Sequence, residues 1–381
     1  MNAPSAPPSP PVTGVRALID GHMLGAAETG NETYVRGLLS GLDTVDRPQV
    51  VALEPGRACP GRHTVVHLSG ASNLRRLLAS LPALARSVGA QVIHTTYAVP
   101  PAASCARVVT IHDCSFVAHP EWFGARDRAV LNAGVRWAAR RAERIIVPSR
   151  HTLGEVLELP GATRDRVVVV AEGVEPRFAP LSPDDVAPVL AGLALERPYV
   201  LTVGNLQPRK NLLRLLHAWS AVVAAGGAGE HVLVLAGGER GRRDDLAGRV
   251  AALRLQDRVR LPGYVADADL PALYCGATLV VCPSLHEGFG LPVLEAMASG
   301  TPVACSRAAA LPETAGDAAA FFDPLDLDGM AATLAALLDD EHTRRELAQR
   351  GLARACGFTW PDCALATCDV YEQAAADRGR R

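Results

Sequence analysis

The chain has 381 residues, which is too long for one ordinary core and suits two domains, since single cores stop growing near roughly 250 to 300 residues. A formal net charge of −2 gives no electrostatic reason to expect nucleic acid as a partner, so any basic site must be local. The nine cysteines are odd in number and never spaced as CxxC. They indicate neither a disulfide framework nor a zinc site and favour reduced thiols in a cytosolic protein.

The first residues, MNAPSAPPSPPVTG, are rich in proline and lack the basic start and apolar run of a secretory signal. Residues 1–13 are therefore predicted to be a disordered leader. No uninterrupted apolar stretch of about 18 residues occurs in the chain, which argues against a transmembrane helix. Contact with a membrane is then expected only at its surface.

Short β-branched runs alternate with helix-like segments through the first half of the chain. The expected strands lie in VRALID, AQVIHTT, RVVTIHD, RIIVPS and RVVVVAEGV. This alternation predicts a parallel sheet with helices on its faces over residues 14–175. Residues 176–197 hold several prolines and no clear strand, so they are predicted to be a linker.

The alternation restarts after the linker, with strands expected in YVLTVGN, HVLVLAGG, RVRLPGYV, ATLVVCPS, TPVACS and AAAFFD. Helical pattern follows, as in residues 211–225 and 311–315, and it continues towards the C-terminus. A second Rossmann-like lobe is therefore predicted over residues 198–357. Two such lobes that face one another place a ligand cleft outside the carboxyl ends of both sheets.

The segment PSLHEGFGLPVLEAMASGTPVACS, residues 283–306, carries the strongest functional signal. Gly288 and Gly290 allow a tight turn after a strand, and Pro292 suits the first turn of a helix. A helix that begins at such a turn is an anion site, because its first N–H groups and its dipole attract negative charge. The N–H groups expected to face a phosphate lie at Phe289, Gly290 and Leu291.

Two carboxylates flank this turn. Glu295, on the helix, is expected to accept both hydroxyls of a ribose, and Glu287, on the loop, to accept hydroxyls of a transferred sugar. Either carboxylate alone could be a solvated surface charge. The glycine turn and the helix start between them favour the functional interpretation.

A second strand-to-helix junction, YVLTVGNLQPRKN, ends a strand at Gly204 and then presents two adjacent cations. Arg209 offers a forked donor and Lys210 a point charge, so the pair suits a diphosphate leaving group without a divalent metal. A bulky side chain in place of Gly204 would block the close approach of substrate. The alternative is a solvated Arg-Lys pair at the surface.

Together, VGNLQPRKN and HEGFGLPVLEAMASGTPV resemble the large family of retaining GT-B glycosyltransferases that includes many bacterial mannosyl- and rhamnosyltransferases. Glu287 and Glu295 stand at the ends of what resembles the E-x7-E motif of that family, which implies contacts with the donor sugar and the ribose. Lys210 and Arg209 match the family's diphosphate-binding cations. Asn205 stands where the family often has an arginine, and it is counted with the donor-binding residues.

The resemblance implies an α/β GT-B fold, in which two Rossmann-like domains face a central cleft. Residues 358–381 are expected to form a helix that crosses back to the first domain, followed by a tail. The nucleotide should bind mainly on the second domain. Its base is expected near Gly263, Tyr264 and Val265.

The first domain carries further candidates. Gly30, in the segment GHMLGAAETGN, would let a helix start approach the donor phosphate, although a plain loop-to-helix glycine is an equal alternative. His112 and Asp113 close a strand and so should lie at the cleft. The resemblance implies that they take part in acceptor binding and catalytic support, and a structural histidine at a strand end is the alternative.

No metal site is predicted. The triplet DAD at Asp267 to Asp269 matches the letters of a DxD metal motif, but it precedes a helix and its aspartates better serve as helix-start residues. The other histidines, including His286 and His119, show no metal spacing. The resemblance implies that the acceptor attacks the donor sugar on the same face from which the diphosphate leaves. A phosphate oxygen of the donor then takes the acceptor proton.

Two Arg-rich segments in the first domain, residues 74–86 and 126–144, are typical of solvated helix faces. A basic amphipathic helix could instead rest on an anionic membrane that carries a lipid-linked acceptor. The solvated interpretation is preferred.

The motifs and the family resemblance together imply a cytoplasmic hexosyltransferase, either free or at the inner face of the membrane. It would move a hexose, such as mannose or rhamnose, from a nucleotide diphosphate-sugar to a glycan, lipid-linked or small-molecule acceptor, with retention and without a metal or another cofactor. The main alternative is a sugar-nucleotide epimerase or hydrolase on the same scaffold. A dinucleotide oxidoreductase is disfavoured because no G-x-G-x-x-G follows the first strand.

Overall fold

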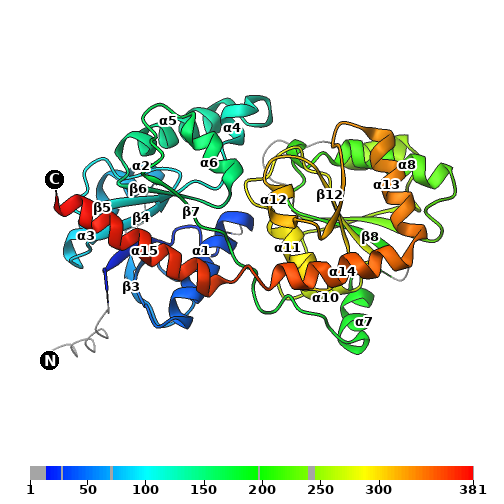
Figure 1. The fold of residues 1–381 in the computed structure, drawn as a ribbon, viewed down its shortest axis with the longest axis horizontal. Coiled ribbons are helices and arrows are strands. Elements are labelled where there is room, and N and C mark those ends of the chain that lie inside the picture. Colours follow the sequence, from blue (N-terminus) through cyan, green and yellow to red (C-terminus); the bar gives the residue numbers. More distant parts are fainter. Residues whose placement is uncertain (1–13, 27–28, 69–71, 196–197, 239–244, 381) are drawn as a thin grey trace.

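A computed structural model describes residues 14–26, 29–68, 72–195, 198–238 and 245–380. The predicted leader, residues 1–13, lies outside the described residues. The chain forms two lobes that lie side by side along the long axis of the molecule (Figure 1). Each lobe is a parallel sheet with helices on both faces, so the predicted α/β class is confirmed.

The first lobe contains a seven-stranded sheet in the order β3-β2-β1-β4-β5-β6-β7. Its strands are β1 (Ala17–Asp20), β2 (Val50–Leu53), β3 (Thr64–His67), β4 (Val92–Thr96), β5 (Ala106–Thr110), β6 (Arg144–Val147) and β7 (Val167–Val169). Its helices are α1 (Thr29–Thr44), α2 (Asn73–Arg75), a π-helical turn (Arg76–Ser80), α3 (Leu81–Ser87), α4 (Ser115–Ala118), a 3-10 turn (Pro120–Trp122), α5 (Ala125–Arg141) and α6 (Arg150–Leu157). Strands β1, β2, β4 and β5 are buried almost throughout, as expected where helices cover both faces of a parallel sheet.

The second lobe contains a six-stranded sheet in the order β10-β9-β8-β11-β12-β13. Its strands are β8 (Tyr199–Val203), β9 (Val232–Ala236), β10 (Val259–Gly263), β11 (Leu279–Cys282), β12 (Val303–Ser306) and β13 (Ala319–Phe322). Its helices are a 3-10 turn (Pro208–Lys210), α8 (Leu212–Ala224), α9 (Leu246–Ala252), α10 (Leu270–Cys275), α11 (Leu291–Ala298), α12 (Leu311–Ala315), α13 (Leu327–Asp339) and α14 (Glu341–Ala355).

Both sheets reverse their strand order at one point, between β1 and β4 in the first lobe and between β8 and β11 in the second. Ligands of doubly wound sheets bind outside the carboxyl ends of the strands at such a reversal. The loops after β8 and β11 carry the predicted cations and the glycine turn. The topology alone therefore brings the two strongest sequence motifs to one place.

A helix lies inside the predicted linker. Helix α7 (Pro183–Gly192) begins after Ser182, whose side chain accepts a hydrogen bond from the N–H of Asp185. It packs against α10, and Leu190 and Leu193 join the core of the second lobe. Part of residues 176–197 thus packs on the second lobe, and the predicted domain bounds remain a prediction.

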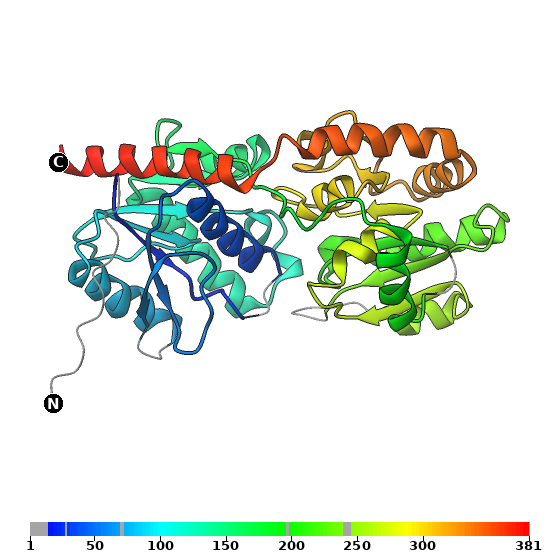
Figure 2. The same cartoon turned by 90° about the horizontal axis from the view of Figure 1, so that it is seen from below.

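The last helix, α15 (Trp360–Gly379), crosses back to the first lobe, as predicted, and packs along α1 (Figure 2). Two glycines of α1 allow this close approach. A Cβ atom at Gly37 would lie 2.0 Å from the ring of Trp360, and one at Gly41 would lie 2.2 Å from its carbonyl oxygen. The docking of α15 therefore depends on glycine at both positions.

The two chain segments that cross between the lobes lie side by side. The N–H of Val174 donates to the carbonyl of Phe358 at 3.0 Å, and Val174 forms a parallel bridge with Thr359. Both crossings thus meet at one place. Among the helices of the described residues, none is long and apolar enough to cross a membrane.

Candidate active site

The predicted cations and the loop carboxylate form one buried cluster in the second lobe. Lys210 donates to Glu287 Oε1 at 2.6 Å, Arg209 to Glu287 Oε2 at 2.9 Å, and the Ser284 hydroxyl to Oε1 at 2.7 Å. Burial favours a raised pKa for Glu287, but the charges of Lys210 and Arg209 outweigh it and hold the pKa well below its ordinary value. The carboxylate is therefore ionised and holds both cations in place.

Gly204 makes room for this cluster. Its φ of +144° is rare for other residues, and a Cβ atom there would lie 3.2 Å from both Cε and Nζ of Lys210. Gly204 was expected to let substrate approach closely. In the structure, the space beside it holds the Lys210 side chain. Lys210 is the one lysine in the sequence, although the chain has 38 basic residues. Sequence reasoning overlooked that signal.

The glycine turn that precedes α11 has the predicted form. Gly290 has φ +110° and is the N-cap residue of the helix, which begins at Leu291. Within the described residues, the N–H groups of Phe289 and Gly290 donate no hydrogen bond. The Phe289 ring is buried against Phe358, with centroids 5.8 Å apart, so this residue offers its backbone to a ligand. Free N–H groups at a helix start suit an anion.

Glu295 lies on α11, and its carboxylate accepts a hydrogen bond from the Tyr274 hydroxyl at 2.8 Å. Burial raises the pKa of Glu295 to about 7, although the Tyr274 hydrogen bond and the charge of Arg177 oppose the shift. The group can therefore change its charge near neutral pH. Tyr274 was not foreseen from the sequence, since it comes from α10, a different helix.

His112 lies at the end of β5 on the facing lobe. Its Nδ1 contacts the Glu172 carboxylate at 2.8 Å, and the Tyr34 ring packs on it edge-on with centroids 4.6 Å apart. Its Nε2 is buried and has no hydrogen-bond partner within the described residues. Glu172 fixes the ring and leaves Nε2 available. The sequence pattern assigned no role to Glu172, which lies near the end of the last segment expected to form a strand in the first lobe.

Asp113 and His112 also mark where the lobes meet. Asp113 Oδ1 accepts from the N–H and hydroxyl of Ser115, at 3.0 and 2.8 Å, so part of its carboxylate stabilises the local turn. A Cβ atom at Gly288 would lie 1.8 Å from the His112 carbonyl oxygen and 3.0 Å from Asp113 Cβ. Gly288 is therefore required for contact between the loop that carries Glu287 and the strand end that carries His112.

The other predicted donor residues lie in both lobes. Gly30 lies in the first turn of α1, and a Cβ atom there would meet nothing within 4 Å. The Asn205 carbonyl accepts from the N–H of Gln207. The Tyr264 side chain is 61% exposed, which leaves it free to pack on a base. Val265 is buried in the core of the second lobe, so only its backbone is available to a ligand, and a base near this residue stays a prediction.

The DAD triplet serves only in part as a helix start. Asp269 is the N-cap residue of α10, but its side chain makes no capping hydrogen bond. Asp267 instead forms an ion pair with Arg36 of the first lobe, at 2.8 Å. The helix-start role assigned to both aspartates was therefore wrong for the Asp267 side chain, because a long-range cation competes for it.

The Arg-rich segment 74–86 is not simply a solvated face. Arg76 is ion-paired with the buried Asp20 of β1, and its side chain is 11% exposed. Leu74 and Leu78 are 67% and 50% exposed. The segment therefore presents apolar side chains outward while one of its arginines stabilises the lobe.

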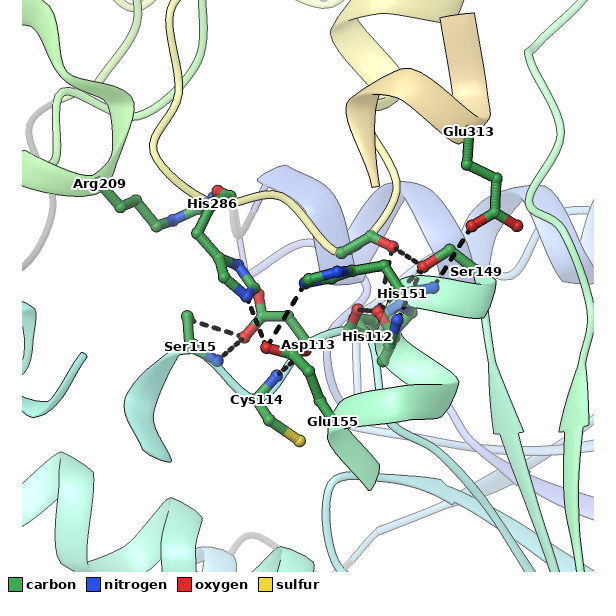
Figure 3. Close-up of polar contacts among 12 residues, drawn as sticks. His112, Asp113, Cys114, Ser115, Ser149, His151, Glu155, Arg209, His286 and Glu313 are labelled. Atoms are coloured by element: carbon green, nitrogen blue, oxygen red, sulfur yellow. Dashed lines mark hydrogen bonds and ion pairs between the residues drawn. The ribbon is translucent and has the colours of Figure 1, made fainter. Parts of the chain in front are cut away.

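Further contacts join the lobes around α6, as Figure 3 shows. The Ser149 and Thr152 hydroxyls donate to the Gly288 carbonyl at 2.7 and 3.2 Å. The Glu313 carboxylate, from α12, accepts from the N–H of Arg150 at 2.9 Å and of His151 at 3.3 Å. The lobes are thus in direct contact around α6.

Two facing Rossmann-like lobes, with two basic side chains and a free helix start at the strand ends of one of them, define an enzyme of the GT-B fold that binds a nucleotide ligand. Residues 191–354 match the family described as "Glycosyl transferases group 1", and residues 29–178 match "Glycosyltransferase Family 4". The chain belongs to this glycosyltransferase family, whose members transfer a sugar from a nucleotide-sugar donor.

Among curated relatives, the O-antigen chain mannosyltransferase B of Escherichia coli is 34% identical over 267 residues, which cover 70% of each chain. The serotype-specific mannosyltransferase WbdA of Escherichia coli is 33% identical over 228 residues, 59% of this chain but 28% of that protein. The D-inositol 3-phosphate glycosyltransferase of Salinispora tropica is 36% identical over 263 residues, 65% of this chain and 54% of that protein.

Solved structures support the fold. Sucrose-phosphate synthase from Thermosynechococcus elongatus superposes with a TM-score of 0.75 at 23% identity, over 95% of this chain and 100% of that one. Anabaena HepE in complex with UDP and glucose superposes with a TM-score of 0.75 at 19% identity, over 93% of this chain and 98% of that one.

Proposed function

We propose that this enzyme transfers mannose from a nucleoside diphosphate-mannose to a hydroxyl of a glycan, with retention of anomeric configuration and without a metal. The observation that supports the proposal most is the buried Lys210–Arg209–Glu287 cluster beside the free helix start of α11. Two cations and a helix dipole supply the positive charge that a diphosphate leaving group needs. The names of the Escherichia coli relatives support mannose as the sugar.

We assign Lys210 and Arg209 to the diphosphate and Glu295 to the ribose. Glu287 accepts three hydrogen bonds from its neighbours in this structure, so its first task is to position both cations. Contact of Glu287 with hydroxyls of the donor sugar, as expected from the sequence, then requires exchange of one of these partners. Tyr264, exposed beside the second lobe's sheet, is the candidate for packing on the base.

In the proposed reaction, the acceptor oxygen bonds to the anomeric carbon on the face from which the diphosphate leaves. The bond from that carbon to the phosphate oxygen breaks, and a phosphate oxygen takes the acceptor proton. Lys210 and Arg209 neutralise the charge that develops on the diphosphate. His112, with its unpartnered Nε2, and Asp113 support the acceptor or the donor sugar from the first lobe.

We further propose that the acceptor binds on the first lobe and that the enzyme acts in the cytoplasm. A lipid-linked acceptor would bring it to the membrane surface, where the exposed Leu74 and Leu78 lie next to Arg75. A glycan or small-molecule acceptor needs no such contact.

The test is transfer with a panel of donors, namely GDP-mannose, dTDP-rhamnose, UDP-glucose and ADP-glucose, with product analysis by NMR. The proposal predicts that GDP-mannose or another nucleoside diphosphate-mannose gives an α-linked product from an α-configured donor. A β-linked product would refute retention. Rearranged or hydrolysed donor with no transfer to any acceptor would instead support the epimerase or hydrolase alternative.

A further inference from the structure

Three side chains that can ligate a metal meet at the contact between the lobes, and none of them is assigned to the donor. His151 and Glu155 lie one turn apart on α6 of the first lobe, and His286 comes from the loop after β11 of the second lobe (Figure 3). One ligand atom from each of the three lies within 4.8 Å of the other two. His286 and Glu155 are 131 residues apart in sequence, so spacing along the chain could not reveal the cluster.

The hydrogen bonds within this cluster leave buried nitrogen atoms unsatisfied. Glu155 Oε1 lies 2.7 Å from His286 Nε2 but 3.7 Å from His151 Nε2, which is too far for a hydrogen bond. His151 Nε2 is buried and has no hydrogen-bond partner within the described residues. Burying a polar atom without a hydrogen-bond partner costs folding free energy. His151 Nε2 is such an atom, and it lies 3.7 Å from Glu155 Oε1.

The geometry is close to that of a metal site. Zn²⁺ binds His nitrogen and carboxylate oxygen at about 2.0 to 2.2 Å, so ligand atoms in a tetrahedral site lie roughly 3.3 to 3.5 Å apart. The 2.7 Å contact would open and the 3.7 Å contact would shorten, each by less than about 1 Å, through side-chain rotation. The second carboxylate oxygen of Glu155 accepts from the N–H of Cys114 at 3.2 Å, which orients Oε1 towards the histidines.

We propose that His151, Glu155 and His286 bind one divalent transition metal ion, with Zn²⁺ preferred, and that this ion links the two lobes. Two imidazoles and one carboxylate suit Zn²⁺, whereas Mg²⁺ prefers oxygen ligands alone. Because two ligands come from one lobe and the third from the other, the ion binds the closed arrangement of the lobes and slows their opening. The site adjoins the donor cluster, because His286 directly precedes Glu287 and Arg209 donates to the His286 carbonyl at 3.3 Å. The three ligands are not donor-binding residues, and the ion takes no part in the transfer step.

The chain contains a matched control for this site. His342 and Glu346 on α14 have the same spacing on a helix as His151 and Glu155, with 3.3 Å between Nε2 and Oε1. Both side chains are exposed, at 83% and 53%. This pair offers the same two ligand types on one helix, but it lies at the surface and, among the described residues, has no third ligand from the other lobe.

The experiment is calorimetric titration of the full-length chain with Zn²⁺. A Cys356→Ser background removes the exposed thiol, since thiolates are Zn²⁺ ligands. We expect one strong site per chain, no comparable binding of Mg²⁺, and an affinity that falls about tenfold or more in His151→Ala and Glu155→Gln. His342→Ala should bind as the parent does. Circular dichroism and the Tm without metal confirm that each variant is folded.

Small-angle scattering tests whether the ion links the lobes. With Zn²⁺, the radius of gyration of the parent should equal that of the closed form, whether the metal-free protein is open or closed. The radius of gyration of His151→Ala should not change when Zn²⁺ is added. Equal Zn²⁺ affinity in His151→Ala and the parent would overturn the site. Binding that leaves an open form unchanged would overturn the link between lobes. No donor or acceptor is present, so failure here is distinct from failure of the proposed function.

Discussion

Replacement of Lys210 by alanine removes one of the two cations assigned to the diphosphate. The lysine is 7% exposed and donates to Glu287 at 2.6 Å, so the change also removes a partner of a buried carboxylate. Glu287 keeps Arg209 and Ser284 as donors. We therefore expect the variant to fold, with a loss of about 1 to 3 kcal/mol in the free energy of unfolding.

The loss of activity follows from a charge-assisted contact of about 1.5 to 3 kcal/mol with the leaving group. Because the lysine is buried, its charge is weakly screened, and we expect about 2 to 3 kcal/mol. This corresponds to a fall of roughly 30- to 150-fold in kcat/KM. Lys210→Arg should also lose activity, since a planar guanidinium does not reproduce the compact point charge that Nζ places 2.6 Å from Glu287 Oε1.

The assay is steady-state transfer by purified protein, with the Tm measured for each variant. Arg249→Ala, which removes an exposed cation of the same lobe, serves as the control and should keep the parent rate. Lys210→Ala or Lys210→Arg with a normal Tm and a kcat/KM within threefold of the parent would refute the assignment of the diphosphate site.

Three other predictions follow from the same site. Because the pKa of Glu295 is raised to about 7 by burial, donor affinity should rise as the pH increases through 7 and the carboxylate ionises, and Glu295→Gln should flatten this dependence in binding titrations. The same shift means that stability falls as the pH rises from 4.5 to about 7, because the folded state holds the proton more tightly. Activity should survive EDTA, since Lys210, Arg209 and the start of α11 supply the positive charge, and strict dependence on Mg²⁺ or Mn²⁺ would contradict this. Saturating donor should reduce the radius of gyration by closing the hinge near Val174, and an unchanged scattering profile would refute closure.

The parts of the fold that were predicted are those written into local sequence. Helix α11 was expected from Gly290 and Pro292, which set its start, and α12 was predicted at residues 311–315, as observed. Strands β2 and β3 were missed, because no helix separates them and the alternation of strand and helix therefore breaks at this point. The two strands are parallel neighbours, although only residues 54–63 connect them.

The candidate site likewise contains residues that local sequence predicted and residues that it did not. Lys210, Arg209 and Glu287 were chosen for their chemistry at strand ends, and the structure brings them together. Glu172, Tyr274 and the Arg36–Asp267 pair were missed because each contact joins residues far apart in sequence. Nothing in the local pattern of either partner indicates such a contact before the chain is folded.

The most direct test of the account is a crystal structure of the enzyme with a nucleoside diphosphate bound. We predict that the diphosphate lies within hydrogen-bonding distance of Lys210 Nζ, Arg209 and the N–H of Gly290, and that the ribose hydroxyls contact Glu295. The Lys210–Glu287 contact should persist beside the ligand. A diphosphate bound elsewhere, with Lys210 and Gly290 left without contact to it, would contradict the central claim.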